Sequence, residues 1–189
     1  MVKQTVIYDA CILYPAGLRS TLMYVGLTGL VQVRWSEAIH DEWIRNVLKD
    51  RKDITPEQLE RTRRLMNTAI PDSLVVGYEA LIETLELPDL NDRHVLAAAI
   101  HAKAEVIVTF NGKDFPNTAL TPHSIEKNTP DAFVLRLLQT HPIQIVEALR
   151  TDRLGKKRPP KSPDEYLDAL IAQRLPRTSA ALRQYIDEL

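Results

Sequence analysis

Two hydrophobic patterns follow one another along the chain, and the change between them falls near residue 128. Before that point, short runs of β-branched and other apolar residues alternate with stretches whose apolar residues recur every three or four positions. The short runs predict buried strands, and the longer stretches predict helices. Strands that alternate with helices and are apolar on both faces are typical of a parallel sheet covered by helices. We therefore predict an α/β domain over residues 1–128.

Capping residues help to place the elements of this domain. Ser36 and Thr55 are good N-cap residues that stand directly before helical patterns, and Asn91 could cap a further helix. The expected strands cover residues 5–9, 31–36, 72–78 and 105–110. The expected helices cover residues 18–30, 36–50, 55–70 and 92–104.

After residue 128 the pattern is helical throughout. The expected helices cover residues 129–140, 141–154, 162–175 and 177–189, and the first and third open with Thr-Pro and Ser-Pro. The stretch "GKKRPPK" at residues 155–161 carries four positive charges, no negative charge and two prolines, so we expect a loop there. We predict a helical C-terminal extension over residues 129–189.

The composition is that of a globular protein, with 44% hydrophobic and 26% charged residues among 189. The formal net charge is -1, so there is no overall basic field, and a contact with nucleic acid would need a local patch. A single cysteine, Cys11, excludes a disulfide within the chain and fits a reducing compartment. No apolar run approaches the ~18 residues of a membrane span, and no signal-peptide pattern is present. We expect a cytoplasmic protein that does not interact with membranes.

Acidic and amide side chains gather where the strands of the predicted sheet end. Asp9 ends the first strand, and Asn111 and Asp114 follow the last one. Asp89 and Asp92 stand at the start of the helix that precedes this last strand. Ligands of parallel sheets bind at the carboxyl ends of the strands. We therefore expect these side chains to face a common volume.

Glu42 adds an acid from the middle of a helix, beside the apolar stripe of Ile39, Trp43 and Val47. Four or five carboxylates at one place repel one another and raise one another's pKa values. A hard divalent cation such as Mg²⁺ or Mn²⁺ relieves this repulsion, because it prefers carboxylate and water oxygens. One or two such ions can activate a water and stabilise the leaving oxygen of a phosphodiester. The acids therefore indicate metal-dependent cleavage of phosphodiesters.

Taken singly, most of these acids have an ordinary structural explanation. Asp92 stands where a helix dipole favours an acid, and Asp89 follows a proline as turn residues often do. Glu42 alone is explained as a solvated helix residue, and Asp114 as part of a turn. Asp9 is the hardest to explain in this way, because an acid within an apolar run is costly to bury without a partner. The single explanations also leave open why all five fall at one predicted sheet edge.

Three segments together resemble a PIN domain, in the branch that contains the VapC-type toxins: "VIYDACILYP", "SEAIHDEWIRN" and "LPDLNDRHVLAAAIHAKAEVIVTFNGKDFP". No single motif is specific, but the ordered set is, and it covers roughly residues 4–125. The resemblance implies a three-layer α/β/α fold with a central parallel sheet. It also implies a metal-dependent endoribonuclease that acts on RNA, is blocked by a cognate antitoxin and forms a homodimer. The helical tail is similar to an extension found on some of these proteins.

The resemblance also assigns roles to residues of this chain. Thr109 and Asn111 match polar positions after the last core strand, where they would orient waters or a phosphate. The family's catalytic, metal-binding acids match Asp9, Glu42, Asp92 and Asp114, with Asp89 as an additional acid near the Mg²⁺ or Mn²⁺.

Two other functions stay open at this point. A phospho-receiver domain also clusters aspartates at one end of a parallel sheet, but it needs an acceptor aspartate after a middle strand and a lysine near the last one. We expect no suitable acceptor here. A non-catalytic RNA-binding module on the same fold would not need the complete set of acids.

The other polar candidates are weaker. The five histidines lack the spacing of a zinc site. Cys11 is expected on the same strand as Asp9, as a small core residue. Lys156, Lys157 and Arg158 of the basic loop are the best local candidates for contact with an RNA backbone.

Overall fold

The computed structural model describes residues 3–189, which form two compact units. The first unit comprises residues 3–14 and 30–128, and the second comprises residues 15–29 and 129–189. Residues 15–29 therefore belong to the predicted α/β domain in sequence but pack with the C-terminal helices in space. The boundary at residue 128 stays a prediction, and residues 1 and 2 of that domain lie outside the described residues.

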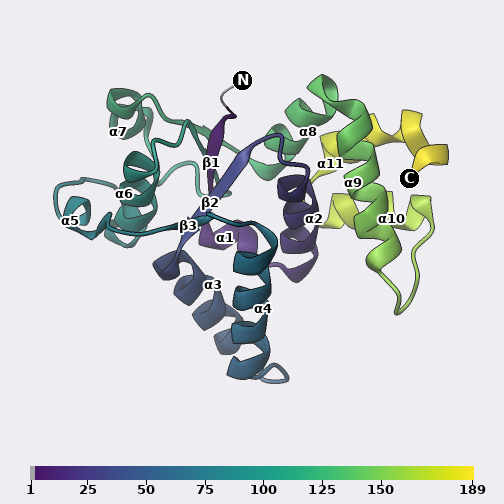
Figure 1. The fold of residues 1–189 in the computed structure, drawn as a ribbon, viewed down its shortest axis with the longest axis horizontal. Helices are drawn as coiled ribbons and strands as arrows, with labels where there is room; N and C mark the ends of the chain where they lie inside the picture. Colours follow the sequence, from purple (N-terminus) through teal and green to yellow (C-terminus); the bar gives the residue numbers. More distant parts are fainter. Residues whose placement is uncertain (1–2) are drawn as a thin grey trace. The chain divides into compact units, whose positions relative to one another are not determined.

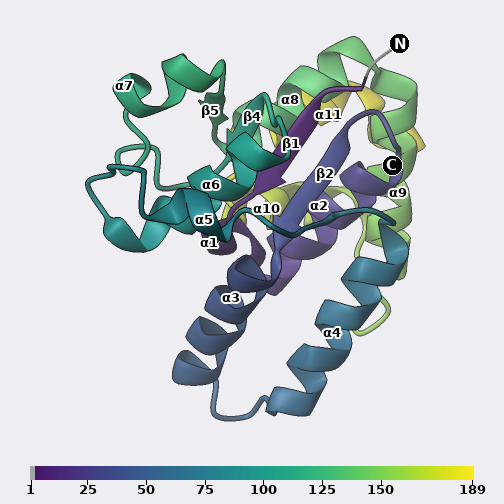
Figure 2. The same ribbon diagram turned by 60° about the vertical axis from the view of Figure 1, so that its left-hand side comes forward.

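The first unit is built on a parallel sheet of five strands in the order β3-β2-β1-β4-β5. Figure 2 shows β2, β1, β4 and β5 of this sheet. In this register Ile7 of β1 lies opposite Arg34 of β2 and Ile107 of β4. The middle strand is buried along its whole length, as its apolar sequence predicts. The strands are β1 (Thr5–Tyr8), β2 (Gln32–Ser36), β3 (Leu74–Val75), β4 (Val106–Val108) and β5 (Glu126–Asn128). The predicted α/β fold with a central parallel sheet is confirmed.

Helices connect these strands, and α6 packs on β1, β2 and β4 while α3 and α4 lie side by side (Figure 2). Ser36 caps α3 by accepting the backbone N–H of Ile39 at 3.2 Å, and Thr55 forms a capping box with Gln58 at the start of α4, as predicted. The helices of this unit are α1 (Ala10–Leu13), α3 (Glu37–Asp50), α4 (Pro56–Ala69), α5 (Glu79–Ile82), α6 (Arg93–His101) and α7 (Asn117–Leu120). Single 3₁₀ turns occur at Leu90–Asp92 and Thr121–His123.

Two local expectations are wrong. The chain turns into the short helix α1 directly after Asp9, so Cys11 lies on this helix and not on the strand. Asn91 does not cap α6, because a 3₁₀ turn comes first and places Asp92 at the N-cap position. The side-chain amide of Asn91 instead donates to Asp89 Oδ1 at 3.0 Å, and the same oxygen accepts the Asn91 backbone N–H at 2.9 Å. These hydrogen bonds stabilise the turn that displaces the start of the helix.

The regular elements of the second unit are all helices within the described residues, and α9 lies beside α2 (Figure 1). Thr129 and Ser162 cap α8 and α10, each followed by a proline in the first turn, as predicted. The helices are α2 (Ala16–Leu27), α8 (Pro130–Thr140), α9 (Pro142–Gly155), α10 (Pro163–Ala172) and α11 (Pro176–Leu182), and a 3₁₀ segment spans Arg183–Glu188. The predicted helical extension is confirmed. No helix among the described residues is long and apolar enough to cross a membrane.

A fully buried carboxylate, Asp152 of α9, joins three elements of the second unit. Its Oδ1 accepts hydrogen bonds from Ser20 Oγ at 2.6 Å and from Lys156 Nζ. Its Oδ2 accepts from Thr21 Oγ1 at 3.0 Å and from Tyr166 Oη at 2.8 Å. A buried carboxylate is tolerated only when its oxygens are satisfied in this way. The network ties α2 to α9 and α10.

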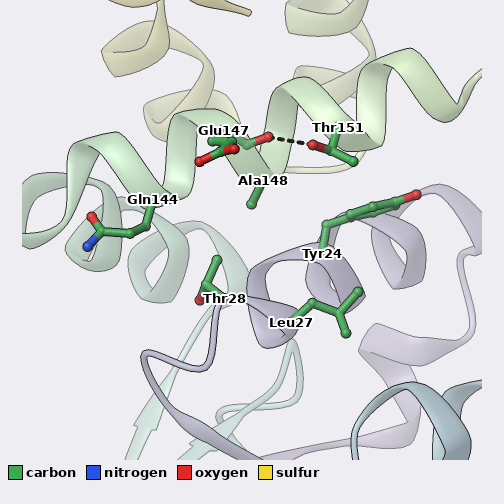
Figure 3. A pocket seen from close by; sticks show the side chains of 7 residues that line it. All are labelled: Tyr24, Leu27, Thr28, Gln144, Glu147, Ala148 and Thr151. Carbon is green, nitrogen blue, oxygen red and sulfur yellow. Dashed lines mark hydrogen bonds between the residues drawn. The ribbon is translucent and has the colours of Figure 1, made fainter.

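A surface hollow of about 400 Å³ lies between α2 and α9 (Figure 3). Tyr24 and Leu27 line it from α2, and Glu147, Ala148 and Thr151 line it from α9. Thr151 Oγ1 donates to the backbone carbonyl of Glu147 at 2.8 Å, so this hydroxyl is already engaged. Glu147 is the single carboxylate of the lining, so the hollow does not contain the acids singled out in the sequence.

Replacing Asp152 with alanine should lower the free energy of unfolding by about 3 kcal/mol or more, because Lys156 and the hydroxyls of Ser20, Thr21 and Tyr166 each lose a hydrogen bond to its carboxylate. Asp164→Ala is the matched control, since the Asp164 side chain is 71% exposed and its pairing with Arg183 at 3.6 Å should contribute at most ~1 kcal/mol. Denaturant unfolding of both variants measures the difference. Equal, small effects would show that the network does not stabilise this unit.

Candidate active site

Asp9 is the best-anchored acid of the site and directly follows the middle strand. Its side chain is almost fully buried, and its Oδ2 accepts hydrogen bonds from Thr109 Oγ1 at 2.6 Å and Cys11 Sγ at 3.1 Å. Thr109 follows β4, so the pairing of β1 with β4 brings the two side chains together. Burial raises the pKa of Asp9, and the hydrogen bonds from Thr109 and Cys11 act in the opposite direction.

Asp92 supplies a second buried carboxylate from the start of α6. Its residue is 6% exposed, and its Oδ2 has no hydrogen-bond partner among the described residues. Burial, followed by the negative charges of nearby acids, raises the pKa of Asp92 to about 7. Those acids are Asp9, Asp89, Glu42 and Asp114. All five acids singled out in the sequence therefore lie near enough to interact.

Glu42 of α3 is joined to α6 by a histidine that the sequence reasoning missed. Glu42 Oε2 and His94 Nε2 are 3.1 Å apart in a hydrogen bond, and both side chains are mostly buried. His94 stands two residues after Asp92, so both groups lie at the N-terminal end of α6. The spacing of the histidines bears only on a zinc site and does not indicate this contact. The signal that could have found His94 is its place two residues after an acid of the site.

The turn after β4 carries the remaining polar residues of the site. The Asn111 backbone N–H donates to Thr109 Oγ1 at 2.8 Å, and the Asp114 backbone N–H donates to the Asn111 carbonyl at 2.9 Å. Hydrogen bonds therefore run from Asp9 through Thr109 into the turn. Asp114, near the end of this turn, is partly exposed, and the next residue, Phe115, is buried.

The donor set suits a hard divalent cation, since it consists of carboxylate oxygens with a threonine and an asparagine beside them. The unpartnered Oδ2 of Asp92 supports this assignment, because a buried carboxylate oxygen normally has a partner. Within residues 3–189, however, no three acidic, histidine or cysteine side chains are gathered closely enough to hold one ion as they stand. The individual ligands therefore stay a proposal.

The basic loop belongs to the second unit, and its three candidate residues differ. Lys156 Nζ contacts both Asp152 and Ser20 at 2.7 Å or less, so Lys156 is part of the buried network. Lys157 and Arg158 are exposed. The predicted RNA contact of this loop therefore rests mainly on Lys157 and Arg158.

In EDTA, Asp92→Asn should be more stable than wild type at pH 7.5, and this gain should shrink as the pH falls to 4. The pKa of Asp92 is raised from 3.8 to about 7, so between these values the folded state holds a proton that the unfolded state has lost. Stability therefore falls as the pH rises through this window, and the substitution removes the loss. We expect a gain of roughly 1–3 kcal/mol at pH 7.5, below the full value of ~1.4 kcal/mol per pKa unit because neighbouring acids can move apart.

Denaturant unfolding at several pH values measures this gain. Asp168→Asn, at an exposed position of α10, is the control and should show no such trend. A wild type that is as stable as Asp92→Asn at pH 7.5 would contradict a crowded carboxylate at this position.

Comparison with known proteins gives two family models that match the chain. The model described as "PIN domain" matches residues 5–113, and the model described as "VapC50 C-terminal domain" matches residues 130–184. A protein of Mycobacterium tuberculosis (strain ATCC 25618 / H37Rv) named "Putative ribonuclease VapC50" is 38% identical over 126 residues, which are 62% of this chain and 71% of the relative. No solved structure matches the chain.

The two matches correspond to the α/β part and the helical part of the chain. The first covers β1 to β4, includes Asp9, Glu42 and Asp92, and ends directly before Asp114. The second begins with α8 and reaches the 3₁₀ segment that follows α11. The resemblance noted in the sequence is confirmed: the chain belongs to the PIN domain family, in its VapC-type branch, and carries a VapC50 C-terminal domain.

Proposed function

We propose that this chain is a metal-dependent endoribonuclease that hydrolyses phosphodiester bonds of RNA, and that it is the toxin of a VapBC-type toxin–antitoxin system. One observation carries the proposal: the buried carboxylate of Asp92 has an oxygen without a partner among residues 3–189 and a pKa raised to about 7 by burial and by neighbouring acids. Such crowding is costly in a protein without a bound cation. The relative named as a ribonuclease supports the choice of RNA.

The acids would hold Mg²⁺ or Mn²⁺, which when bound lowers the pKa of a water and offsets the charge of the phosphate. In the proposed set, Asp9, Glu42, Asp92 and Asp114 are the ligands and Asp89 is an additional acid nearby. Hydrolysis joins a water oxygen to phosphorus and breaks the bond from phosphorus to the leaving oxygen, which then takes up a proton.

The other groups of the site orient these acids. Thr109 and Cys11 both donate to one oxygen of Asp9 and thereby fix its carboxylate. His94 holds Glu42, whereas Asp92 keeps one oxygen without a partner. The side chain of Asn111, in the turn after β4, would orient a water or a phosphate oxygen. Preorganised ligands of this kind lower the cost of reaching the reactive geometry.

The partners follow from the same proposal. RNA is the substrate, and a cognate antitoxin would inhibit the enzyme by covering the acidic edge of the sheet. We also propose a homodimer, a cytoplasmic location and a division between nuclease domain and extension at residue 128. The free thiol of Cys11 is compatible with a reducing cytoplasm.

The two alternative functions are less well supported. We expected no suitable phospho-acceptor, although β1 is the middle strand and Asp9 follows it. A phospho-acceptor must reach its phosphoryl donor, however, and Asp9 is 1% exposed and already accepts two hydrogen bonds. A non-catalytic RNA-binding module does not explain why an unpartnered carboxylate is kept buried at Asp92.

Purified protein incubated with total RNA should cut it in the presence of Mn²⁺ and leave it intact in EDTA, with sequencing of the new ends as the measurement. Asp9→Asn and Asp92→Asn should each reduce cleavage to background, because each removes a proposed ligand. Asp53→Asn is the control, since Asp53 is 65% exposed and should leave cleavage unchanged.

An active Asp92→Asn protein would contradict the mechanism. Wild-type protein that binds RNA without cutting it would favour the non-catalytic module instead. Cleavage that persists in EDTA would exclude the metal dependence.

Replacing both Lys157 and Arg158 with alanine should weaken RNA binding and flatten its salt dependence, because fewer counterions are released. The slope of log K against log salt should fall by about 1.4, at ~0.7 per phosphate contact on a single strand. Cleavage at saturating RNA should not change. Arg61→Ala with Arg64→Ala removes two exposed charges of α4 as a control. Equal slopes for wild type and the loop variant would show that the loop does not touch RNA.

A further inference from the structure

The turn that carries Asp114 is held at its start by the hydrogen bonds of the site. Asn111 is tied to Thr109 by its backbone N–H, and Thr109 is tied to Asp9. These contacts fix the chain up to Asn111 but do not extend to residues 112–115. Asp114 lies three residues further on, at a position that is partly exposed.

A lysine from the edge strand β5 anchors the rest of this turn. Lys127 Nζ donates to the backbone carbonyl of Gly112 at 2.6 Å and to that of Phe115 at 2.7 Å. The two carbonyls lie on either side of Asp114 in the sequence. Hydrogen bonds from an ammonium group are shorter and stronger than neutral ones, and both of these are short. Lys127 therefore holds the turn before and after Asp114.

The strand that carries Lys127 is itself fixed to the sheet. Lys127 lies opposite Ile107 of β4, and the Thr109 backbone N–H donates to the Asn128 carbonyl at 2.9 Å. β4 also carries the chain into the turn. Lys127 and the turn that it holds therefore both start from the paired strands β4 and β5. This pairing limits how far the turn can move relative to Asp9.

We propose that Lys127 is a positioning residue that holds the turn of residues 111–115 so that Asp114 faces the other acids of the site. The expected effect on kcat rests on the proposed nuclease function. The expected effect on the order of the turn does not depend on that function. Asp114 is partly exposed, and its backbone N–H is bonded within its own turn, so its placement should depend on such an anchor. Lys127 acts through the backbone and need not touch RNA.

Lys127→Met tests the proposal, because methionine keeps an unbranched apolar stem and removes the donors. Lys113→Met is the matched control: Lys113 precedes Asp114 directly, is exposed and makes no described hydrogen bond with its side chain to this turn. Both variants remove one positive charge from the same turn region. An effect confined to Lys127→Met therefore comes from the lost hydrogen bonds and not from the changed charge.

With an RNA of defined sequence and saturating Mn²⁺, Lys127→Met should lower kcat by about ten- to a hundredfold, because a small displacement of a catalytic group has this effect. KM for the RNA should stay within about threefold of wild type. Lys113→Met should keep the wild-type kcat. Lys127→Gln keeps amide donors without the charge and on a shorter side chain, so it should have an intermediate kcat. It provides the test if the methionine variant does not fold.

Hydrogen exchange without metal or RNA supplies a readout that does not depend on cleavage. The amide of Asp114, which donates to Asn111, should exchange faster in Lys127→Met and at the wild-type rate in Lys113→Met. If wild-type protein fails to cut RNA, the nuclease proposal fails. The exchange rates still test whether Lys127 holds the turn. Unchanged exchange, a wild-type kcat in Lys127→Gln, or equal effects of the two methionine variants would overturn the role of Lys127.

Discussion

Mutual repulsion among carboxylates at the end of the middle strand is the constraint on which the rest of the first unit depends. Asp9 is buried and receives its hydrogen bonds from Thr109 and Cys11, and both donors are available only because β1 pairs with β4 and then turns at once into α1. Burial, with the repulsion added to it, raises the pKa of Asp92 to about 7. A fold that accepts this cost at one sheet edge is suited to a cation there, and a helix-terminal acid alone would not need it.

Local rules were enough to predict much of this arrangement. Ser36 and Thr55 cap helices by contacts within three residues, and Asp9 stands out because it ends an apolar run. The features that could not be predicted depend on distant residues or on weak local signals. His94 meets Glu42 across 52 positions of sequence, and no periodicity encodes that pairing. The strand β5 has the polar sequence "EKN" at the edge of the sheet, so it lacks the apolar pattern that reveals a buried strand.

The helix α2 shows a different limit of sequence reasoning. Its residues fall inside the matched PIN segment, yet they pack in the unit formed with the C-terminal helices. Leu18, Leu22 and Val25 of α2 are fully buried, and Ser20 and Thr21 donate to the buried Asp152. Hydrophobic spacing correctly indicates a helix here but not the partner that covers it. The C-terminal helices therefore complete the packing of this PIN sequence, and a chain cut at residue 128 would leave an apolar helix face exposed to water.

The polar residues of the site fall into two groups, the acids and the hydrogen-bond donors beside them. The acids repel one another, so nothing in their own interactions holds them together. Thr109, Cys11, His94 and Lys127 supply what the acids lack, because each donates hydrogen bonds to an acid or to the backbone beside one. Asp92 is different, since no described residue donates a hydrogen bond to its Oδ2 and it stands at the N-cap of α6. In such a site, neighbouring residues that need not take part in the chemistry keep the repelling carboxylates in place. Oδ2 of Asp92 stays available for the proposed cation.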